Sequence, residues 1–411
     1  MSFNQYTWDL YKQTTIGIEM IKYFSDAGGY VLFKDYCPYA NFIPEDLYND
    51  WLENIYCYGV SDYDHPSSLE EAKDLYISLI TLGIRVEGQQ WLPANDFKNM
   101  LGIIQPMSYV LSQFAPEYFF PYLFLCRIFE LNKIADFFNI DLPNIPKRTD
   151  YKGRCMYYWE LCEVFYLFRK ENGLSPADLW SFLYDFAPNN LPSEKIDMPK
   201  PSQVWFIGGR LYQEDKSLES KFWQSSPETK KGDILVHYET SPISAITCIE
   251  ISLTDGVIDP LFRYYGCIYI GNRINIPHIT LKELQTDEYF FKHPLVRKNF
   301  QGVNGWSVNS ENYSELLRMI KTKGFDIEVL PKLYAPTLPK DVIIEYEHDV
   351  EQQLLEPLLN SMGWYENKDF IRQLPIQAGR GHRIFPDYAL HYGNKPNEER
   401  AKVLIEAKLC M

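Results

Sequence analysis

The spacing of hydrophobic and polar positions changes along the chain, and the first part is helical in pattern. Apolar residues recur at helical intervals in residues 69–80, 104–140 and 155–168. Residues 175–178, Ser-Pro-Ala-Asp, are typical of a capping box with proline at the first helical position. We therefore predict a mostly α-helical domain over residues 1–195, in which no motif indicates an activity.

The second part has the pattern of strands. Short runs rich in β-branched and aromatic residues, separated by turn residues, occupy positions 204–207, 230–238, 244–251 and 264–270. Helical patterns follow Pro277 and cover residues 312–321. This arrangement predicts a small β-barrel with helices over residues 202–325. Polar, proline-rich stretches at 189–201 and 332–340 are typical of linkers.

The third part, residues 341–411, combines a helix with two short strands. The strands, at 383–390 and 401–408, flank turn-rich residues and are expected to form a hairpin. Strand alternation then puts Glu406 and Lys408 on one face, and pairing brings Asp387 beside them. Two carboxylates at one point repel each other unless a cation lies between them, and oxygen ligands suit Mg²⁺ or Mn²⁺. We predict that Asp387 and Glu406 bind this metal and that Lys408 orients an attacking water.

Composition narrows the class of protein. Hydrophobic residues make up 46% of the chain and aromatic residues 16%, which indicates a folded protein. The formal net charge of −15 argues against a generally basic nucleic-acid coat but allows a local basic groove. The start has no signal-peptide pattern, and no apolar run is long enough to span a membrane. We therefore expect a cytoplasmic protein without membrane contact.

The cysteines indicate a reducing compartment. None of the 8 cysteines has the paired C-x-x-C spacing of a zinc site, so zinc is not expected. Four of them lie in apolar surroundings and are predicted to be reduced core residues: Cys126, Cys162, Cys248 and Cys267.

The C-terminal motif resembles the PD-(D/E)XK nuclease family. The resemblance rests on Pro386-Asp387 and Glu406-Ala407-Lys408, preceded by a helix pattern over 346–364 and a strand pattern over 372–377, as in type I restriction-type nucleases. It implies a partial α/β nuclease fold over residues 341–411 with Asp387, Glu406, Lys408 and the helix residue Glu351 as catalytic residues. In the family the core continues with a helix after Glu-x-Lys, which implies weak or absent cleavage by these 411 residues. The alternative is a structural hairpin with surface charges.

The central part resembles the EVE domain of the PUA-like superfamily over residues 202–325. The residues that carry the resemblance are, in order, Trp205, Trp223, Lys231-Gly232-Asp233, Tyr238, Asp259-Pro260, Pro277 and residues 295–302. Such domains hold a flipped modified base in an aromatic pocket, which here implies Trp223, Tyr238 and Trp306. Arg210, Arg297 and Lys298 are the expected phosphate contacts. The alternative is that the aromatic residues are barrel core and the cations are solvated surface.

Together the two resemblances imply a multidomain α+β protein that acts in restriction or phage defence. It would recognise a modified base, such as a modified cytosine, in double-stranded DNA and hydrolyse the DNA with Mg²⁺ or Mn²⁺; a homodimer is a further expectation. Two alternatives stay open. One is a modified-DNA-binding protein with a degenerate nuclease remnant that does not cleave, and the other is an RNA-directed protein, since PUA-like folds also bind RNA.

Overall fold

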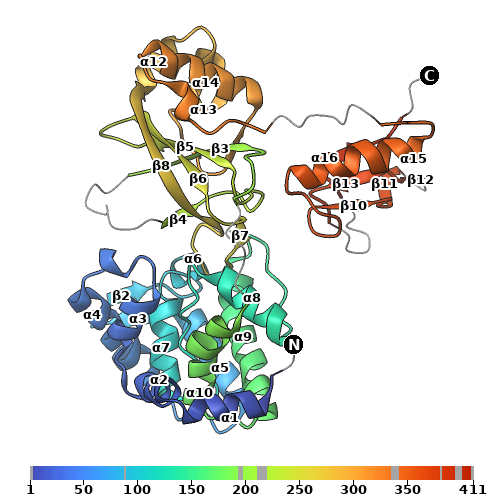
Figure 1. Ribbon diagram of the computed structural model, residues 1–411. Coiled ribbons are helices and arrows are strands. Elements are labelled where there is room, and N and C mark those ends of the chain that lie inside the picture. The colour runs from blue at the N-terminus through green and yellow to red at the C-terminus, as the bar shows by residue number, and fades with distance from the viewer. Residues whose placement is uncertain are drawn as a thin grey trace. The chain divides into compact units, whose positions relative to one another are not determined.

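The computed structural model describes residues 3–87, 89–192, 198–210, 220–334, 342–379, 382–393 and 400–408. It is a mixed α/β structure whose chain divides into two compact units (Figure 1). The first unit combines Met1–Lys195 with Val257–Cys267, and the second combines Ile196–Gly256 with Ile268–Met411. The segment Val257–Cys267 thus belongs to the first unit, although the sequence pattern places it in the barrel predicted over residues 202–325.

The first unit is mainly helical. Its α-helices are α1 (Gln5–Gln13), α2 (Thr15–Asp26), α3 (Gly29–Tyr36), α4 (Glu45–Ile55), α5 (Leu69–Leu82), α6 (Phe97–Met100), α7 (Ile104–Phe114), α8 (Ile128–Phe138), α9 (Tyr151–Glu171), α10 (Pro176–Ser181) and α11 (Ala187–Asn190). The short helices are η1 (Ala40–Phe42), η2 (Tyr56–Val60) and η3 (Phe182–Phe186), and a hairpin joins β1 (Ile84–Val86) to β2 (Gln89–Leu92).

Local sequence signals account for several of these helices. Ser175 and Asp178 form the predicted capping box, each side chain accepting from the other's backbone N–H, so that α10 begins at Pro176. The predicted helix at 69–80 is confirmed as α5, which begins after the Ser68 cap. The helical pattern at 104–140 is divided into two helices at its prolines, because α7 ends before Pro116 and α8 begins after Pro121.

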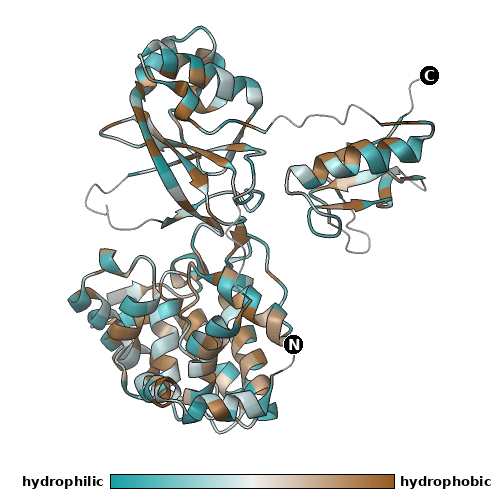
Figure 2. Ribbon diagram, in the orientation of Figure 1, coloured by the Kyte–Doolittle hydropathy of each residue, from teal (hydrophilic) through white to brown (hydrophobic). Residues whose placement is uncertain are grey.

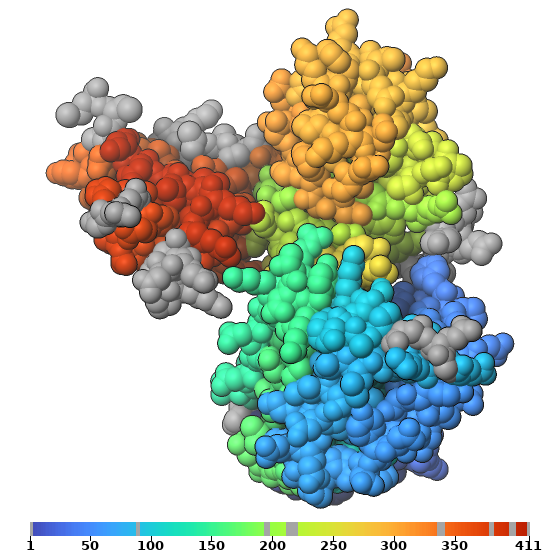
Figure 3. All heavy atoms as spheres, turned by 180° about the vertical axis from the view of Figure 1, so that it is seen from behind, coloured from blue at the N-terminus to red at the C-terminus, as the bar shows by residue number. Residues whose placement is uncertain are grey.

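Aromatic side chains fill the core of the helical unit. Trp8, Tyr76, Tyr158 and Trp159 are almost fully buried in one large apolar cluster. Apolar positions lie along the helices beside polar ones in the hydropathy view (Figure 2), and the unit is a continuous packed body in the space-filling view (Figure 3). This much buried aromatic surface provides the main stabilisation of the unit.

Buried hydrogen bonds hold the segment Val257–Cys267 against the helices of the first unit. The Asp259 carboxylate is fully buried and accepts a hydrogen bond from the backbone N–H of Cys126, at 2.9 Å. The buried Arg154 side chain donates from Nε to the carbonyl of Pro260 (2.8 Å) and from Nη2 to that of Phe262 (2.7 Å). Because a buried charge is costly unless it is hydrogen-bonded, these contacts define where the segment lies.

The second unit is built on a sheet that curls into a half-barrel, which fits the predicted barrel in part. Its strand order is β4-β8-β6-β5-β3-β9, and β7 pairs with β8 (Figure 1). Strands β3 and β5 run parallel, whereas β5–β6 and β6–β8 are antiparallel. The strands are β3 (Val204–Gly209), β4 (Ser220–Gln224), β5 (Ile234–Glu239), β6 (Ala245–Ser252), β7 (Val257–Ile258), β8 (Gly266–Thr280) and β9 (Trp306–Val308). Of these, β7 and the first two residues of β8 belong to the segment Val257–Cys267 of the first unit.

The two faces of this sheet have separate apolar clusters, as strand alternation requires. The larger face packs against helices and includes Val236 and Tyr238 of β5. The smaller face includes Trp205, Ile207 and Leu235, with Trp223 packed against it. The helices are α12 (Leu281–Thr286), α13 (Pro294–Arg297) and α14 (Ser310–Thr322), with the short η4 (Phe290–Lys292) and η5 (Ile327–Val329).

The C-terminal segment of the same unit has its own small sheet. Strands β10 (Phe370–Arg372), β13 (Tyr388–Leu390) and β14 (Val403–Ile405) form it in the order β10-β13-β14, and β11 (Ile376–Gly379) pairs with β12 (His382–Ile384). The preceding helical stretch consists of α15 (Glu347–Val350), η6 (Glu351–Leu355) and α16 (Glu356–Ser361). Leu359, Phe370 and Tyr388 bury the contact between helix and sheet.

Candidate functional site

Strand pairing brings the two halves of the C-terminal motif together. β13 and β14 are antiparallel, with Tyr388 opposite Ile405 and Leu390 opposite Val403, so the predicted pairing is confirmed. The predicted strand at 383–390 is divided, because its first part is β12, which pairs with β11. Asp387, directly before β13, accepts a hydrogen bond at Oδ2 from the backbone N–H of Ala407 (2.7 Å). Its other oxygen accepts from the Gln373 side chain (3.1 Å). These two bonds hold the half-buried carboxylate beside the Glu-x-Lys segment.

Burial alternates through that segment as the sequence predicts. Glu406 and Lys408 are exposed, and Ala407 between them is buried. The two charged side chains therefore share one face, and the Ala407 amide is the group that contacts Asp387. Carboxylate oxygens with access to water are the ligands that Mg²⁺ and Mn²⁺ prefer, and the metal assignment of Asp387 and Glu406 stays a prediction.

Glu351 lies in a different electrostatic setting. It is in the helical turn η6, and its Oε2 lies 3.8 Å from a guanidinium nitrogen of Arg372 on β10. Arg372 also pairs with Glu356 and Glu366, and its guanidinium lies over the Tyr388 ring at 5.4 Å. Arg372 thus balances the acidic helix beside the motif strands.

Trp223 is the predicted base-stacking residue that lies on the smaller face of the central sheet. It is half-buried, its ring centroid lies 4.8 Å from that of His237, and its indole N–H donates to Asn304 Oδ1 at 3.3 Å. A Cβ on Gly209 would lie 2.5 Å from the indole, so glycine at this position permits the close approach of the ring.

Tyr238 and Trp306 lie on the other face. Tyr238 is 3% exposed and stacks on Phe300, with ring centroids 4.0 Å apart and planes at 2°. Trp306, half-buried, packs against the same cluster, opposite Phe206 in the register of β3 and β9. The structure therefore brings Tyr238 and Trp306 to one apolar cluster and places Trp223 on the opposite face. Trp205 lies in the core, with its indole N–H on Asp233 at 2.9 Å.

The three predicted phosphate contacts are exposed cations. Arg297 and Lys298 are adjacent at the C-terminal end of α13. Arg210 follows β3 and donates from Nε to the carbonyl of Ser241 at 3.2 Å. Arg297 and Lys298 thus form one pair, and Arg210 belongs to another element.

A buried polar cluster lies next to Trp223, and sequence reasoning missed it. His237, Cys248 and Glu250 come from β5 and β6, and one ligand atom of each lies within 4.8 Å of the others. Among the described residues, this is the group of three or more such side chains that is close enough to hold a metal ion. The signal available in the sequence was the alternation Cys248-x-Glu250 on a buried strand, which puts both side chains on one face.

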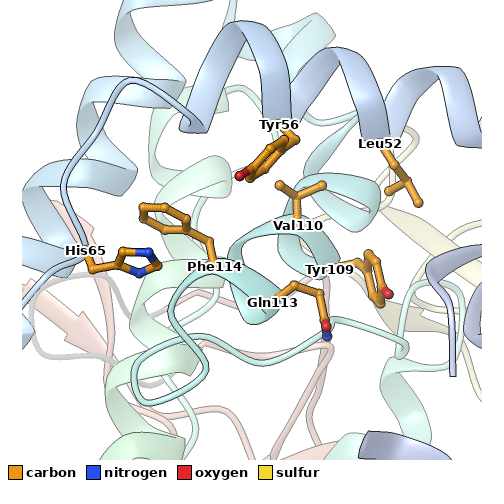
Figure 4. Close-up of a pocket in the computed structure, with 7 residues that line it drawn as sticks. All are labelled: Leu52, Tyr56, His65, Tyr109, Val110, Gln113 and Phe114. Atoms are coloured by element: carbon orange, nitrogen blue, oxygen red, sulfur yellow. The ribbon is translucent and has the colours of Figure 1, made fainter. Parts of the chain in front are cut away.

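The helical unit has a separate open hollow of about 320 Å³. It is lined by Leu52, Tyr56, His65, Tyr109, Val110, Gln113 and Phe114 (Figure 4). The His65 and Phe114 rings stack there, with centroids 4.1 Å apart. The lining combines apolar side chains with the polar groups of Tyr56, His65, Tyr109 and Gln113, and the sequence pattern predicts no site here.

Comparison with known proteins shows no family for the chain. No protein-family model matches it, and no curated protein matches it. Among solved structures, the chain is similar to the NMR structure of Rpa0253 from Rhodopseudomonas palustris, at 14% sequence identity and a TM-score of 0.26. The match covers 29% of this chain and 94% of that chain. A TM-score at this level carries no argument about fold or function. Within the described residues, no helix is long and apolar enough to cross a membrane.

Proposed function

We propose that this protein binds double-stranded DNA that carries a modified base and hydrolyses its phosphodiester bonds with Mg²⁺ or Mn²⁺, in restriction or phage defence. The observation that carries the proposal is the hydrogen bond from the Ala407 amide to Asp387, beside the exposed pair Glu406 and Lys408. An Asp carboxylate held against a Glu-x-Lys segment is the arrangement expected for a PD-(D/E)XK nuclease.

In this proposal each residue of the motif has one task. Asp387 and Glu406 hold the metal ion, which supplies Lewis-acid stabilisation of charge on the phosphoryl group when bound. Lys408, on the same face as Glu406, orients the attacking water and stabilises negative charge. Gln373 and the Ala407 amide fix the Asp387 carboxylate, so that the ligand is oriented before the metal binds.

The central sheet supplies the DNA-reading half of the proposal. Trp223 is half-buried beside a polar cluster, and it offers an indole face on which an extruded base can stack. Exposed Arg297, Lys298 and Arg210 supply contacts to the phosphate backbone. The overall charge of −15 makes such local cations necessary for any DNA complex.

Cleavage of matched substrates tests this function. The full chain is incubated with duplexes that contain modified or unmodified cytosine, and with the corresponding RNA, in Mg²⁺, Mn²⁺ or a chelator. Because the family's core continues with a helix after Glu-x-Lys, we expect weak metal-dependent cleavage of the modified duplex by these 411 residues, and its loss in Asp387→Asn and Lys408→Ala. Lys402→Ala is the matched control, because Lys402 is an exposed lysine beside the same strand but outside the motif. Cleavage that persists in Asp387→Asn contradicts the assignment.

A second candidate function, modified-DNA or RNA binding without cleavage, is favoured by the environment of Glu351. This carboxylate pairs with Arg372, and no third carboxylate joins Asp387 and Glu406 in a group within 4.8 Å among the described residues. Specific binding of modified DNA with no cleavage in either metal supports this candidate. Preference for RNA over both duplexes supports its RNA-directed form.

A further inference from the structure

A buried polar cluster lies in the central sheet and consists of residues other than those of the C-terminal motif. His237, Cys248 and Glu250 are 0%, 0% and 2% exposed. His237 lies directly opposite Cys248 in the register of β5 and β6, and Glu250 is two residues further along β6 on the same face. Three side chains with nitrogen, sulfur and oxygen ligands therefore face one point from two neighbouring strands.

Only some of the polar atoms in this cluster have a hydrogen-bond partner in the part of the chain that the structure describes. His237 Nδ1 lies 3.0 Å from Glu250 Oε2, while the other ring nitrogen, Nε2, is buried without a hydrogen-bond partner among the described residues. The Cys248 thiol has a long contact of 4.0 Å with the Thr247 hydroxyl. Buried polar atoms are normally paired, so an unpaired imidazole nitrogen beside a thiol and a carboxylate indicates a missing partner.

We propose that His237, Cys248 and Glu250 bind a zinc ion. Their donor set is that of zinc proteins, in which imidazole, thiolate and carboxylate ligands surround the metal. One ligand atom each of His237, Cys248 and Glu250 lies within 4.8 Å of the others, which is close enough for a single ion to contact all three. Three protein ligands leave the fourth position to a small ligand such as water.

The surroundings of the cluster suit a metal site. Arg273 Nε donates to Glu250 Oε1 at 2.8 Å, which leaves Oε2 directed to His237. Such a hydrogen bond to the ligand carboxylate orients it and tunes its charge. Ile207 and Leu235 belong to the apolar cluster of this face, and Trp223 packs against the imidazole. An apolar shell of this kind limits the access of water to the ion.

The site has a charge balance that favours a divalent cation. Thiolate and carboxylate contribute two negative charges, and Arg273 contributes one positive charge. A thiol ligand gives up its proton when a metal ion binds, so zinc and a proton compete for the Cys248 sulfur atom.

Cobalt substitution and metal analysis test the proposal on the full chain. The protein is stripped with a chelator, supplied with Zn²⁺ or Co²⁺ alone, and dialysed. We expect one tightly held ion per chain and, with Co²⁺, a sulfur-to-cobalt charge-transfer band. Cys248→Ser abolishes the band, and Glu250→Gln and Arg273→Ala weaken zinc binding, the latter by about 10- to 100-fold. Zn²⁺ raises the melting temperature of the parent protein but not that of Cys248→Ser.

Two controls separate this site from other ligands. Cys162→Ser removes an equally buried thiol of the helical unit and keeps the band, and Asp387→Ala keeps the zinc ion while it removes the proposed nuclease ligand. The absence of a charge-transfer band in the folded parent protein, or a band that persists in Cys248→Ser, overturns the proposal. The cobalt spectrum of the folded parent protein is enough to support or contradict the zinc site. The test therefore remains valid even if a variant fails to fold.

Discussion

The Asp387 carboxylate accepts a hydrogen bond from the backbone N–H of Ala407, at 2.7 Å, across the end of the β13–β14 pair. This contact joins a residue that precedes one strand to a residue that follows the other. It also fixes the carboxylate next to Glu406 and Lys408, which alternate with the buried Ala407. One hydrogen bond thus serves both the local fold and the proposed chemistry, and the two roles can be separated by mutation.

Asp387→Asn and Asp387→Ala differ in this respect. Asn keeps an oxygen that can accept from the Ala407 amide, so we expect little loss of stability but loss of Mn²⁺ binding. Ala removes the acceptor as well, and the unpaired amide costs about 1–3 kcal/mol. Urea unfolding measures the loss of stability, Mn²⁺ titration measures metal binding, and hydrogen exchange of the Ala407 amide measures the loss of its hydrogen bond. Equal Mn²⁺ affinity in the parent protein and Asp387→Asn contradicts the metal assignment.

Trp223 and Tyr238 should behave differently when replaced by alanine. Tyr238 is buried and stacked on Phe300, so Tyr238→Ala is expected to cost about 3–5 kcal/mol of unfolding free energy. Trp223 is half-buried, and its replacement should cost less stability but remove base stacking of roughly 1–3 kcal/mol. Chemical denaturation and binding to modified and unmodified duplexes measure both effects. Equal affinity of the parent protein for the modified and unmodified duplexes contradicts the proposal that Trp223 helps to recognise a modified base.

Asp233 gives the central sheet a specific pH dependence. Burial raises the pKa of this carboxyl from 3.8 to about 6, against the hydrogen bonds that it accepts from the Lys230 amide and the Trp205 indole. The folded state therefore binds more protons than the unfolded state between about pH 4 and 6, and stability falls as pH rises through this window. A shift of about two units corresponds to about 3 kcal/mol at most.

Asp233→Asn provides the comparison for this pH dependence. Its unfolding free energy should change less between about pH 4 and 6 than that of the parent protein, because the group that titrates is absent. Asp259, whose pKa burial also raises to about 6, contributes the same sign and remains in both proteins. Parallel pH profiles of the two proteins contradict the assignment to Asp233.

Arg154 is expected to be a major contributor to the stability of the helical unit. Arg154→Met removes the donors of the Pro260 and Phe262 carbonyls and keeps most of the side-chain volume. We expect a loss of about 2–4 kcal/mol, since each buried acceptor left unpaired costs about 1–3 kcal/mol. Thermal and urea unfolding measure the change. Arg148→Met is the control, because Arg148 is an exposed neighbour, and an equal loss in both variants contradicts the role of Arg154.

Local signals in the sequence predicted much of the secondary structure. The capping box at Ser175 and the helical spacing of residues 69–80 involve contacts within a few residues, so the pattern alone determines them. The hairpin of Asp387 and Glu406 was predictable for a related reason: its strands are close in sequence and flank a turn-rich stretch. The β1–β2 hairpin was not predicted, because it lies within residues 1–195, where the spacing of apolar residues is mostly helical.

Contacts between distant residues could not be predicted in this way. Asp259 and Cys126 are 133 positions apart, and no local pattern pairs them. The opposition of His237 and Cys248 depends on the register of β5 and β6, which shifts between His237 and Tyr238. Because a shift by one residue moves every later side chain to the other face, the sequence could not show which polar residues meet. The local spacing of the cysteines likewise gave no sign of a cluster that forms only when β5 and β6 pair.

The insertion of Val257–Cys267 into the helical unit affects how this protein is made. Residues 1–195 are synthesised well before Asp259 and Pro260 are added to the chain. Cys126 and Arg154 therefore lack these hydrogen-bond partners when the N-terminal helices first form. At roughly 5–20 residues per second, the intervening chain of about 70 residues takes roughly 4–14 s to synthesise. During that interval the Arg154 side chain and the Cys126 amide stay hydrated. The N-terminal unit is completed when the segment Val257–Cys267 leaves the exit tunnel.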